Sequence, residues 1–182
     1  MICRMHNISN ERAFDLLSEG KPLTKVFIDG ELFLKIATDE VWHHEVIFED
    51  CIIENFSAIG VRFEKQVKFI NCNFKKCELS FTYFLGGLTV DKCIFDNYLD
   101  FQAGGHNKKG NPIIITNNSF KDFVNFFDCW YEYNVIVTKN IFFKGTNLLG
   151  KPHNINVTFD IEPVIQGNIG QVDLDNEGDK DY

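Results

Sequence analysis

The chain has 182 residues, 45% of them hydrophobic, so it is long enough to bury the core of one domain. Its formal net charge is −8, and half of that charge lies in residues 171–182, where five acidic residues face one lysine. An acidic chain without clustered Lys and Arg is not expected to bind nucleic acid directly. No segment has the apolar length of a membrane span, so we expect no membrane partner either.

The N-terminal segment, residues 1–25, predicts a short amphipathic helix. Ser9 or Asn10 suits the N-cap position, and Gly20 followed by Pro22 ends a helix. The residues between them carry an apolar stripe, which consists of Phe14, Leu16 and Leu17. We expect this capping helix to cover one end of the structure that the following residues form.

From residue 46 onward a short sequence phrase repeats. Cys51, Cys72 and Cys93 are spaced by 21 residues, and the phrase returns with Asn118 and Asn140 in place of the cysteine. A period near 20 residues is typical of solenoids, in which each unit buries its apolar face only against its neighbours. Alternation such as Val67-Lys-Phe69 is that of a short strand, and helical spacing is absent from residues 45–145. We therefore predict an all-β fold, a parallel β-helix.

Equivalent positions of successive coils stack at the strand spacing of about 4.8 Å and form ladders. We expect two ladders to point into the core. The Cys/Asn ladder is Cys51, Cys72, Cys93, Asn118 and Asn140, and the Phe ladder, two residues later, is Ile53, Phe74, Phe95, Phe120 and Phe142. A further aromatic row is predicted on the opposite side of the coil, at Trp42, Phe63, Phe84 and Tyr131.

Between residues 72 and 86 the period falls to five, in Cys72-Asn-Phe-Lys-Lys, Cys77-Glu-Leu-Ser-Phe and Thr82-Tyr-Phe-Leu-Gly. This pattern resembles the pentapeptide-repeat family over residues 45–102, and loosely to residue 145. The resemblance implies a right-handed β-helix in which four pentapeptides form one square coil. Strict pentads fail after Gly86, and the ladder spacing widens to 25 and then 22 residues, so a β-helix of the wider right-handed type is the alternative.

We predict about six to seven coils over residues 26–170, the last of them irregular. The acidic segment 171–182 is expected to be a mobile tail.

The cysteines predict core packing, because a small inward residue is needed at each corner of the coil. Cys72 and Cys77 form one poor half of a zinc site, and no second pair accompanies them. We expect no metal, no cofactor and reduced thiols. Because the N-terminus has no apolar stretch of signal-peptide length, a cytoplasmic protein is expected.

The segment 102–112 is the best functional candidate, because it lies in the longest spacing of the Cys/Asn ladder. It is rich in glycine and contains His106, Asn107, Lys108 and Lys109, which suit a carboxylate-bearing partner. The competing interpretation is a flexible loop that relieves the mismatch in coil length.

Three other groups have weaker signals. His43 and His44 point to opposite faces if they lie in a strand, which favours a surface pair over a joint site. Asp100 and Asp128 are carboxylates that adjacent coils can bring together. An exposed apolar strip, which would mark an interface, is predicted among Phe127, Tyr133 or Phe143, with core packing as the equal alternative.

The function favoured by the sequence is a non-enzymatic scaffold that binds an unknown protein partner, and we consider a homodimer through the C-terminal coil. The resemblance suggests a first alternative, a DNA-mimic modulator of a topoisomerase such as gyrase. A second alternative is a carbohydrate-active β-helix enzyme, although such enzymes resemble longer, exported chains.

Overall fold

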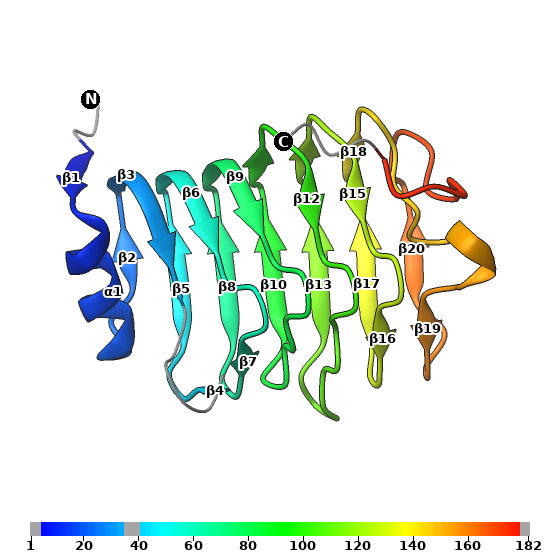
Figure 1. Cartoon of the computed structure of the whole chain (residues 1–182), viewed down its shortest axis with the longest axis horizontal. Coiled ribbons are helices and arrows are strands. Elements are labelled where there is room, and N and C mark those ends of the chain that lie inside the picture. Colours follow the sequence, from blue (N-terminus) through cyan, green and yellow to red (C-terminus); the bar gives the residue numbers. More distant parts are fainter. Residues whose placement is uncertain (1–4, 35–40, 179–182) are drawn as a thin grey trace.

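Short parallel strands joined by tight corners form the structure, a computed structural model that describes residues 5–34 and 41–178. All strand pairings among the described residues are parallel and join equivalent positions of successive coils (Figure 1). The result is a parallel β-solenoid of about six turns with one short helix. This confirms the predicted all-β solenoid and its capping helix.

Three sheets run along the solenoid. The first contains β1 (His6–Ile8), β3 (Val26–Phe33), β6 (Ile52–Ser57), β9 (Asn73–Glu78), β11 (Ile94–Phe95), β14 (Ser119–Phe120) and β18 (Ile141–Phe142), with β12 (Leu99–Asp100) and β15 (Val124–Asn125) beside them. The second contains β2 (Leu23–Thr24), β5 (Val46–Glu49), β8 (Val67–Ile70), β10 (Leu88–Asp91), β13 (Ile113–Thr116), β17 (Val135–Thr138) and β20 (Val164–Gln166). The third is built from the pairs β4 (Val41–Trp42) with β7 (Arg62–Phe63) and β16 (Trp130–Tyr131) with β19 (Thr158–Phe159), which single bridges at Tyr83 and Gly105 connect.

The corner between the second and first sheets has one backbone conformation in every coil. The residue before each member of the Cys/Asn ladder has a φ between 51° and 57°, and these residues are Asp50, Asn71, Lys92, Asn117 and Lys139. Gly167, which precedes Asn168 at the same corner of the last coil, has a φ of 66°. Asn, Asp and Gly tolerate this left-handed region better than other residues do. The turn-type residues of the repeated phrase therefore set the bend that directs the ladder residue inward.

The Phe ladder fills the core behind this corner. Phe74, Phe95, Phe120 and Phe142 are fully buried, and successive ring centroids are 5.0, 5.1 and 5.0 Å apart with nearly parallel planes. The distance matches the strand spacing of about 4.8 Å. Flat rings stack well at this spacing, which explains why Phe recurs at this position in four successive coils.

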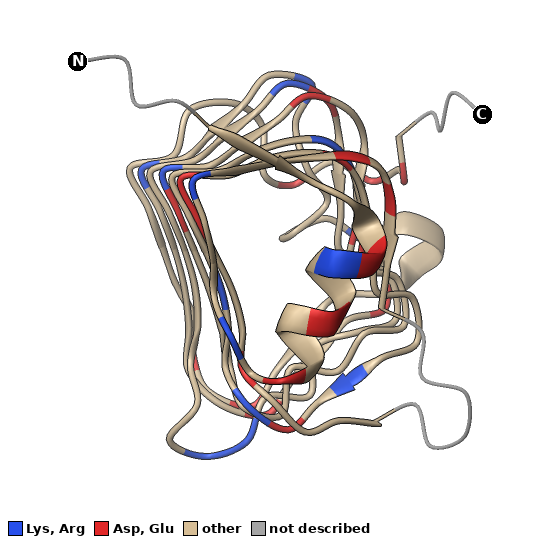
Figure 2. Ribbon diagram, turned by 90° about the vertical axis from the view of Figure 1, so that its left-hand side faces the viewer, with Lys and Arg blue, Asp and Glu red and all other residues tan. Residues whose placement is uncertain are grey.

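The N-terminal end is covered by α1 (Asn10–Ser18), which crosses the end of the first coil (Figure 2). Its N-cap is Ser9, whose Oγ accepts a hydrogen bond from the Arg12 N–H at 3.2 Å. Ala13 and Leu17 are buried against the first coil. β1, which the sequence pattern did not predict, pairs with β3. No helix among the described residues is long and apolar enough to cross a membrane.

The C-terminal residues 171–178 form a strap over the solenoid, whereas the sequence predicted a mobile tail. They turn back from the last coil over the preceding ones (Figure 1). The Leu174 N–H donates to the Thr146 carbonyl at 3.2 Å, and the Tyr98 hydroxyl donates to the Glu177 carbonyl at 2.7 Å. Residues 179–182 of the predicted tail lie outside the described residues.

Candidate interaction surfaces

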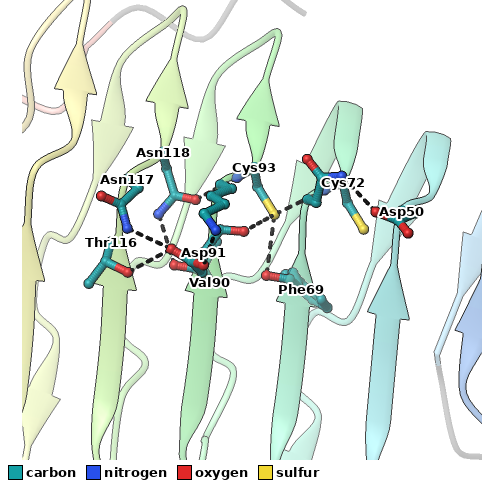
Figure 3. Close-up of polar contacts among 11 residues, drawn as sticks. Asp50, Phe69, Cys72, Val90, Asp91, Cys93, Thr116, Asn117 and Asn118 are labelled. Carbon is teal, nitrogen blue, oxygen red and sulfur yellow. Dashed lines mark hydrogen bonds and ion pairs between the residues drawn. The ribbon is translucent and has the colours of Figure 1, made fainter.

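The Cys/Asn ladder is a continuous chain of hydrogen bonds inside the corner, and Figure 3 shows its middle part, with Cys72, Cys93 and Asn118. The Cys51 N–H donates to Sγ of Cys72, and the Cys72 N–H donates to Sγ of Cys93, both at 3.4 Å. In the next coil the acceptor is an asparagine: the Cys93 N–H donates to Oδ1 of Asn118 at 2.8 Å. Asn140 continues the ladder. Each side chain satisfies a buried main-chain N–H of the preceding coil, which gives this ladder a structural role.

Asn168 is a further ladder member that the sequence pattern did not identify. Its Oδ1 accepts the Asn140 N–H at 2.9 Å, and its Nδ2 donates to the Val137 carbonyl at 2.9 Å. It follows Asn140 by 28 residues, well beyond the 21-residue period. The segment Gly167-Asn168-Ile169 repeats the corner motif after the strand Val164–Gln166, and this local motif could have identified Asn168 as a ladder member.

The thiols of the described part of the chain are free, buried and poorly suited to chemistry. Cys51, Cys72, Cys77, Cys93 and Cys129 form no disulfide. Hydrogen bonding with Cys51 lowers the pKa of Cys72, but hydrogen bonding with Cys93 and burial raise it to about 12. Burial raises the pKa of Cys129 to about 12 as well. No group of three or more metal-ligating side chains occurs within residues 5–34 and 41–178.

Charged side chains alternate in sign along the first sheet. The residues after the Phe ladder form an outward row, in which Lys75 Nζ lies 2.9 Å from Glu54 Oε1 and Lys121 Nζ lies 2.7 Å from Asp96 Oδ1. Viewed along the axis, blue and red segments lie next to each other at the same corners (Figure 2). This row therefore presents paired charges, and a continuous line of carboxylates is not formed on it.

The candidate loop 102–112 folds back onto the solenoid. Lys108 Nζ lies 2.8 Å from Glu132 Oε2, and His106 Nδ1 lies 3.2 Å from Glu132 Oε1. The hydrogen bonds from Lys108 and then His106 hold the pKa of Glu132 below its usual range. Asn107 points inward and is fully buried, with its Nδ2 donating to the Asn111 carbonyl at 3.0 Å. Of the four predicted residues, Asn107 is therefore removed from any outward surface, while Lys109 is exposed.

Three rings contact one another along the third sheet, and we call them the aromatic strip: Tyr83, His106 from this loop, and Trp130. The His106 ring centroid lies 4.1 Å from that of Tyr83 and 5.4 Å from that of Trp130. The strip was not predicted, because residues 123–133, which include Trp130, contain six aromatic residues and the sequence does not show which of them point outward.

The predicted apolar strip is not continuous. Phe143 is exposed, whereas Phe127 and Tyr133 are half-buried, and the Phe127 ring lies against His153 at 5.8 Å. Phe143 occupies the position after Phe142, next to Lys121 in the row of alternating charges. It is thus an isolated aromatic side chain at the C-terminal end of that row.

The two other predicted pairs do not form sites. His43 pairs with Glu64 at 2.9 Å on the surface, and His44 is exposed. Asp100 is buried inside the coil, where its Oδ1 accepts hydrogen bonds from the Gln102 N–H and Asn125 Nδ2. Asp128 is exposed on the outside, so the two carboxylates do not converge.

The C-terminal end of the solenoid differs from the capped N-terminal end. Tyr131 and Val137 are 2% and 0% exposed, but their partners in the last coil, Phe159 and Ile165, are only half-buried. Several large apolar side chains of this coil are exposed: Leu149, Ile155, Ile161, Val164 and Ile169. In the described chain, β19 and β20 are the last strands of their sheets and pair on one side only. This end therefore exposes a group of large apolar side chains together with two unpaired strand edges.

Comparison of the chain with protein-family models, with curated proteins and with solved structures found no match. Function must therefore be argued from the geometry of these surfaces.

Proposed function

We propose that this protein is a non-enzymatic scaffold that binds protein through its C-terminal end, and that the partner is a second copy of the chain in an end-to-end homodimer. The observation that supports this is the difference between the two ends. α1 covers the first coil, whereas the last coil leaves Ile165 and Phe159 of its inward face half-buried. Isolated apolar residues on a surface are ordinary, but a cluster around one open end indicates an interface.

A second copy suits this end in shape and in hydrogen bonding. The free edge of β20 carries main-chain N–H and C=O groups, and an unpaired edge of this kind pairs readily with another strand. The end of an identical coil has the same cross-section. A two-fold contact would pair β20 with its own copy and would close the assembly, because both open ends are used.

The proposal also includes the repeat type and handedness of the solenoid and the location of the protein. We infer a coil of the pentapeptide-repeat type, right-handed as the resemblance implies. Its support is that the pentad positions Cys72, Cys77 and Thr82 are all buried, as are the central residues Phe74, Leu79 and Phe84. The free thiols of the described cysteines favour a reducing, cytoplasmic location.

Neither alternative function gains comparable support. Duplex mimicry needs rows of unpaired carboxylates, whereas Glu54 and Asp96 are paired with Lys75 and Lys121. Glycan hydrolysis needs two convergent carboxyl groups, and the pair suggested by the sequence, Asp100 and Asp128, lies on opposite sides of the coil wall.

Light scattering after size-exclusion chromatography tests the proposal. We expect the wild-type chain to elute at twice its mass of 21.0 kDa. Ile169→Lys should give the monomer mass, because it places a charge in the interface. Ile94→Lys is the matched control, since Ile94 and Ile169 belong to the same outward row of the first sheet, three coils apart.

Circular dichroism would show whether Ile169→Lys is folded, and Leu149→Lys provides a second variant at the same end. A wild-type chain that elutes at 21.0 kDa at every concentration would overturn the homodimer. Equal dimerisation of Ile169→Lys and Ile94→Lys would overturn the C-terminal interface.

A further inference from the structure

The aromatic strip on the third sheet is a second surface, and its geometry points to a binding site for a neutral oligosaccharide chain. It lies on a lateral face and does not depend on the C-terminal interface. Tyr83, Gly105 and Trp130 occupy equivalent positions of successive coils there. The argument rests on how these rings are held, how they are exposed and which charges surround them.

Gly105 determines how the strip is built. Its φ is 105°, and a Cβ at this position would lie 2.4 Å from the Trp130 carbonyl oxygen. A side chain at position 105 therefore cannot stack between those of Tyr83 and Trp130, although the three residues occupy equivalent positions. The chain turns at this glycine, and the ring of the next residue, His106, fills the gap between the two aromatic rings. The longer coil at residues 102–112 thus supplies the middle member of the strip.

Polar contacts fix the rings before any ligand binds. The Trp130 Nε1–H donates to Asp160 Oδ1 at 2.8 Å, while the His106 ring is held by Glu132 at 3.2 Å. The Arg62 guanidinium lies over the Tyr83 ring, 5.2 Å from its centroid. Although Trp130 is held in this way, it is 45% exposed. Tyr83 and His106 are half-buried, so Trp130 is the member of the strip that offers an exposed ring, and its rigidity lowers the entropic penalty of binding.

The charges around the strip balance. Arg62 and Lys108 are offset by Glu132 and Asp160, and Lys108 is already paired with Glu132. A charged ligand would therefore gain little electrostatic binding energy from these groups, which favours a neutral ligand. These same groups and the Tyr83 hydroxyl still offer hydrogen-bond donors and acceptors at the edges of the rings.

A neutral sugar matches both properties. A pyranose ring has an apolar C–H face that packs on aromatic rings and hydroxyl groups at its edge that hydrogen-bond with polar side chains. Tyr83 and Trp130 lie two coils apart, roughly 9.6 Å along the axis at the strand spacing. This is comparable with the length of a disaccharide unit. An extended chain parallel to the axis that packs one sugar on Trp130 would bring the next sugar but one to Tyr83, whose ring already contacts Arg62 and His106 and whose hydroxyl would bind that sugar.

Tryptophan fluorescence tests this proposal directly, because the chain has two Trp residues and Trp42 is buried. Trp42→Phe leaves Trp130 as the single reporter, and Trp42 Nε1 makes no hydrogen bond that the described residues would lose. We expect cellohexaose, xylohexaose or laminarihexaose to shift the Trp130 emission and to protect it from acrylamide. In the wild-type background, Trp130→Ala should raise the Kd measured by calorimetry roughly tenfold or more.

Phe143→Ala is the control, since Phe143 is an exposed aromatic side chain outside the strip; its Kd should equal that of the wild type. If Trp42→Phe does not fold, the indole N–H resonance of Trp130 in the wild-type protein gives the same information. The proposal is overturned if none of the three hexasaccharides affects Trp130, if Trp130→Ala binds them as tightly as the wild type, or if only a charged oligogalacturonate binds.

Discussion

Oδ1 of Asn140 accepts two hydrogen bonds from Asn118, one from the main-chain N–H at 2.9 Å and one from Nδ2 at 3.0 Å. The equivalent main-chain contact in the cysteine half of the ladder, from the Cys51 N–H to Cys72 Sγ, is longer at 3.4 Å. Asparagine therefore ties neighbouring coils together more strongly than cysteine does. We expect the two halves of the ladder to differ in stability.

Replacement of Asn118 tests the strength of this ladder. Asn118→Ala leaves the buried Cys93 N–H and the Val90 carbonyl without their partner, so we expect a loss of about 2–4 kcal/mol in the free energy of unfolding. Asn118→Cys restores an acceptor for the N–H and should lose about half as much. Urea unfolding measures both. An equal loss in the two variants would show that the side-chain acceptor does not matter.

Asp100 begins a second interior row of polar side chains, which continues through Asn125 and Asn147. Asn125 Nδ2 donates to Asp100 Oδ1 at 3.1 Å, and Asn147 Nδ2 donates to Asn125 Oδ1 at 2.7 Å. Asp100→Asn keeps an acceptor at this position, so its unfolding free energy should lie within about 1 kcal/mol of the wild type.

Asp100→Leu removes that acceptor from the buried Asn125 Nδ2 and from the part-buried Gln102 N–H, and it should cost about 2–3 kcal/mol. Chemical denaturation of the two variants at neutral pH gives the comparison. If Asp100→Leu were as stable as Asp100→Asn, the row would contribute nothing beyond packing volume.

Gly178 lies at the end of the strap and packs against Phe123, so a substitution there should disturb the strap locally. A Cβ on Gly178 would lie 2.5 Å from Cγ of Phe123, and the residue has a φ of +69°. Gly178→Ala should therefore loosen the strap. The amides of Thr146 and Leu149, which donate to the carbonyls of Gln171 and Val172, should exchange faster with deuterium.

Gly60→Ala is the matched control for backbone strain. Gly60 has a similar φ of +74° but open space around the added Cβ. It should lower global stability by about 1 kcal/mol without a specific change at Thr146 or Leu149. The same exchange profile in both variants would contradict the contact between Gly178 and Phe123.

Much of the fold was predictable because the period of the ladders is fixed. In a strand, a slip of one residue would turn every side chain to the opposite face. The 21-residue spacing therefore predicts which residues share a row, as the pairing of Phe74 with Phe95 illustrates. The N-terminal segment predicted Ser9 or Asn10 as the N-cap, and the structure has Ser9; capping could be predicted because it depends only on neighbouring residues.

The surfaces were less predictable, because they depend on residues far apart in the sequence. The strap joins Glu177 to Tyr98 across 79 residues, and no periodic signal marks that contact. The aromatic strip depends on the missing side chain of Gly105, which redirects His106 outward. Asn107 was assigned to a surface loop from its polarity, yet its amide satisfies main-chain groups in the interior.

Glu132 predicts a pH dependence of stability. Its pKa is lowered in the folded protein, first by Lys108 and then by His106. A lowered carboxyl pKa stabilises the fold above the unfolded value of about 4.3, and this contribution is lost as the pH falls through the folded-state pKa. Because these side chains are partly exposed, we expect less than about 1 kcal/mol.

Thermal or urea unfolding of Glu132→Gln at several pH values measures this contribution. The variant should be less stable than the wild type at pH 7, and the difference should disappear at pH values below the folded-state pKa. Glu162→Gln, in the exposed last coil, is the control. A difference that persists at low pH would mean that Glu132 acts through packing.

Hydrogen–deuterium exchange at several protein concentrations tests the proposed C-terminal interface most directly. If two copies meet end to end, the amides of the last strands, β19 and β20, should exchange more slowly as the concentration rises, while those of β5 and β8 should not change. The effect should be absent in Ile169→Lys. Exchange in β19 and β20 that is independent of concentration in the wild type would contradict the interface.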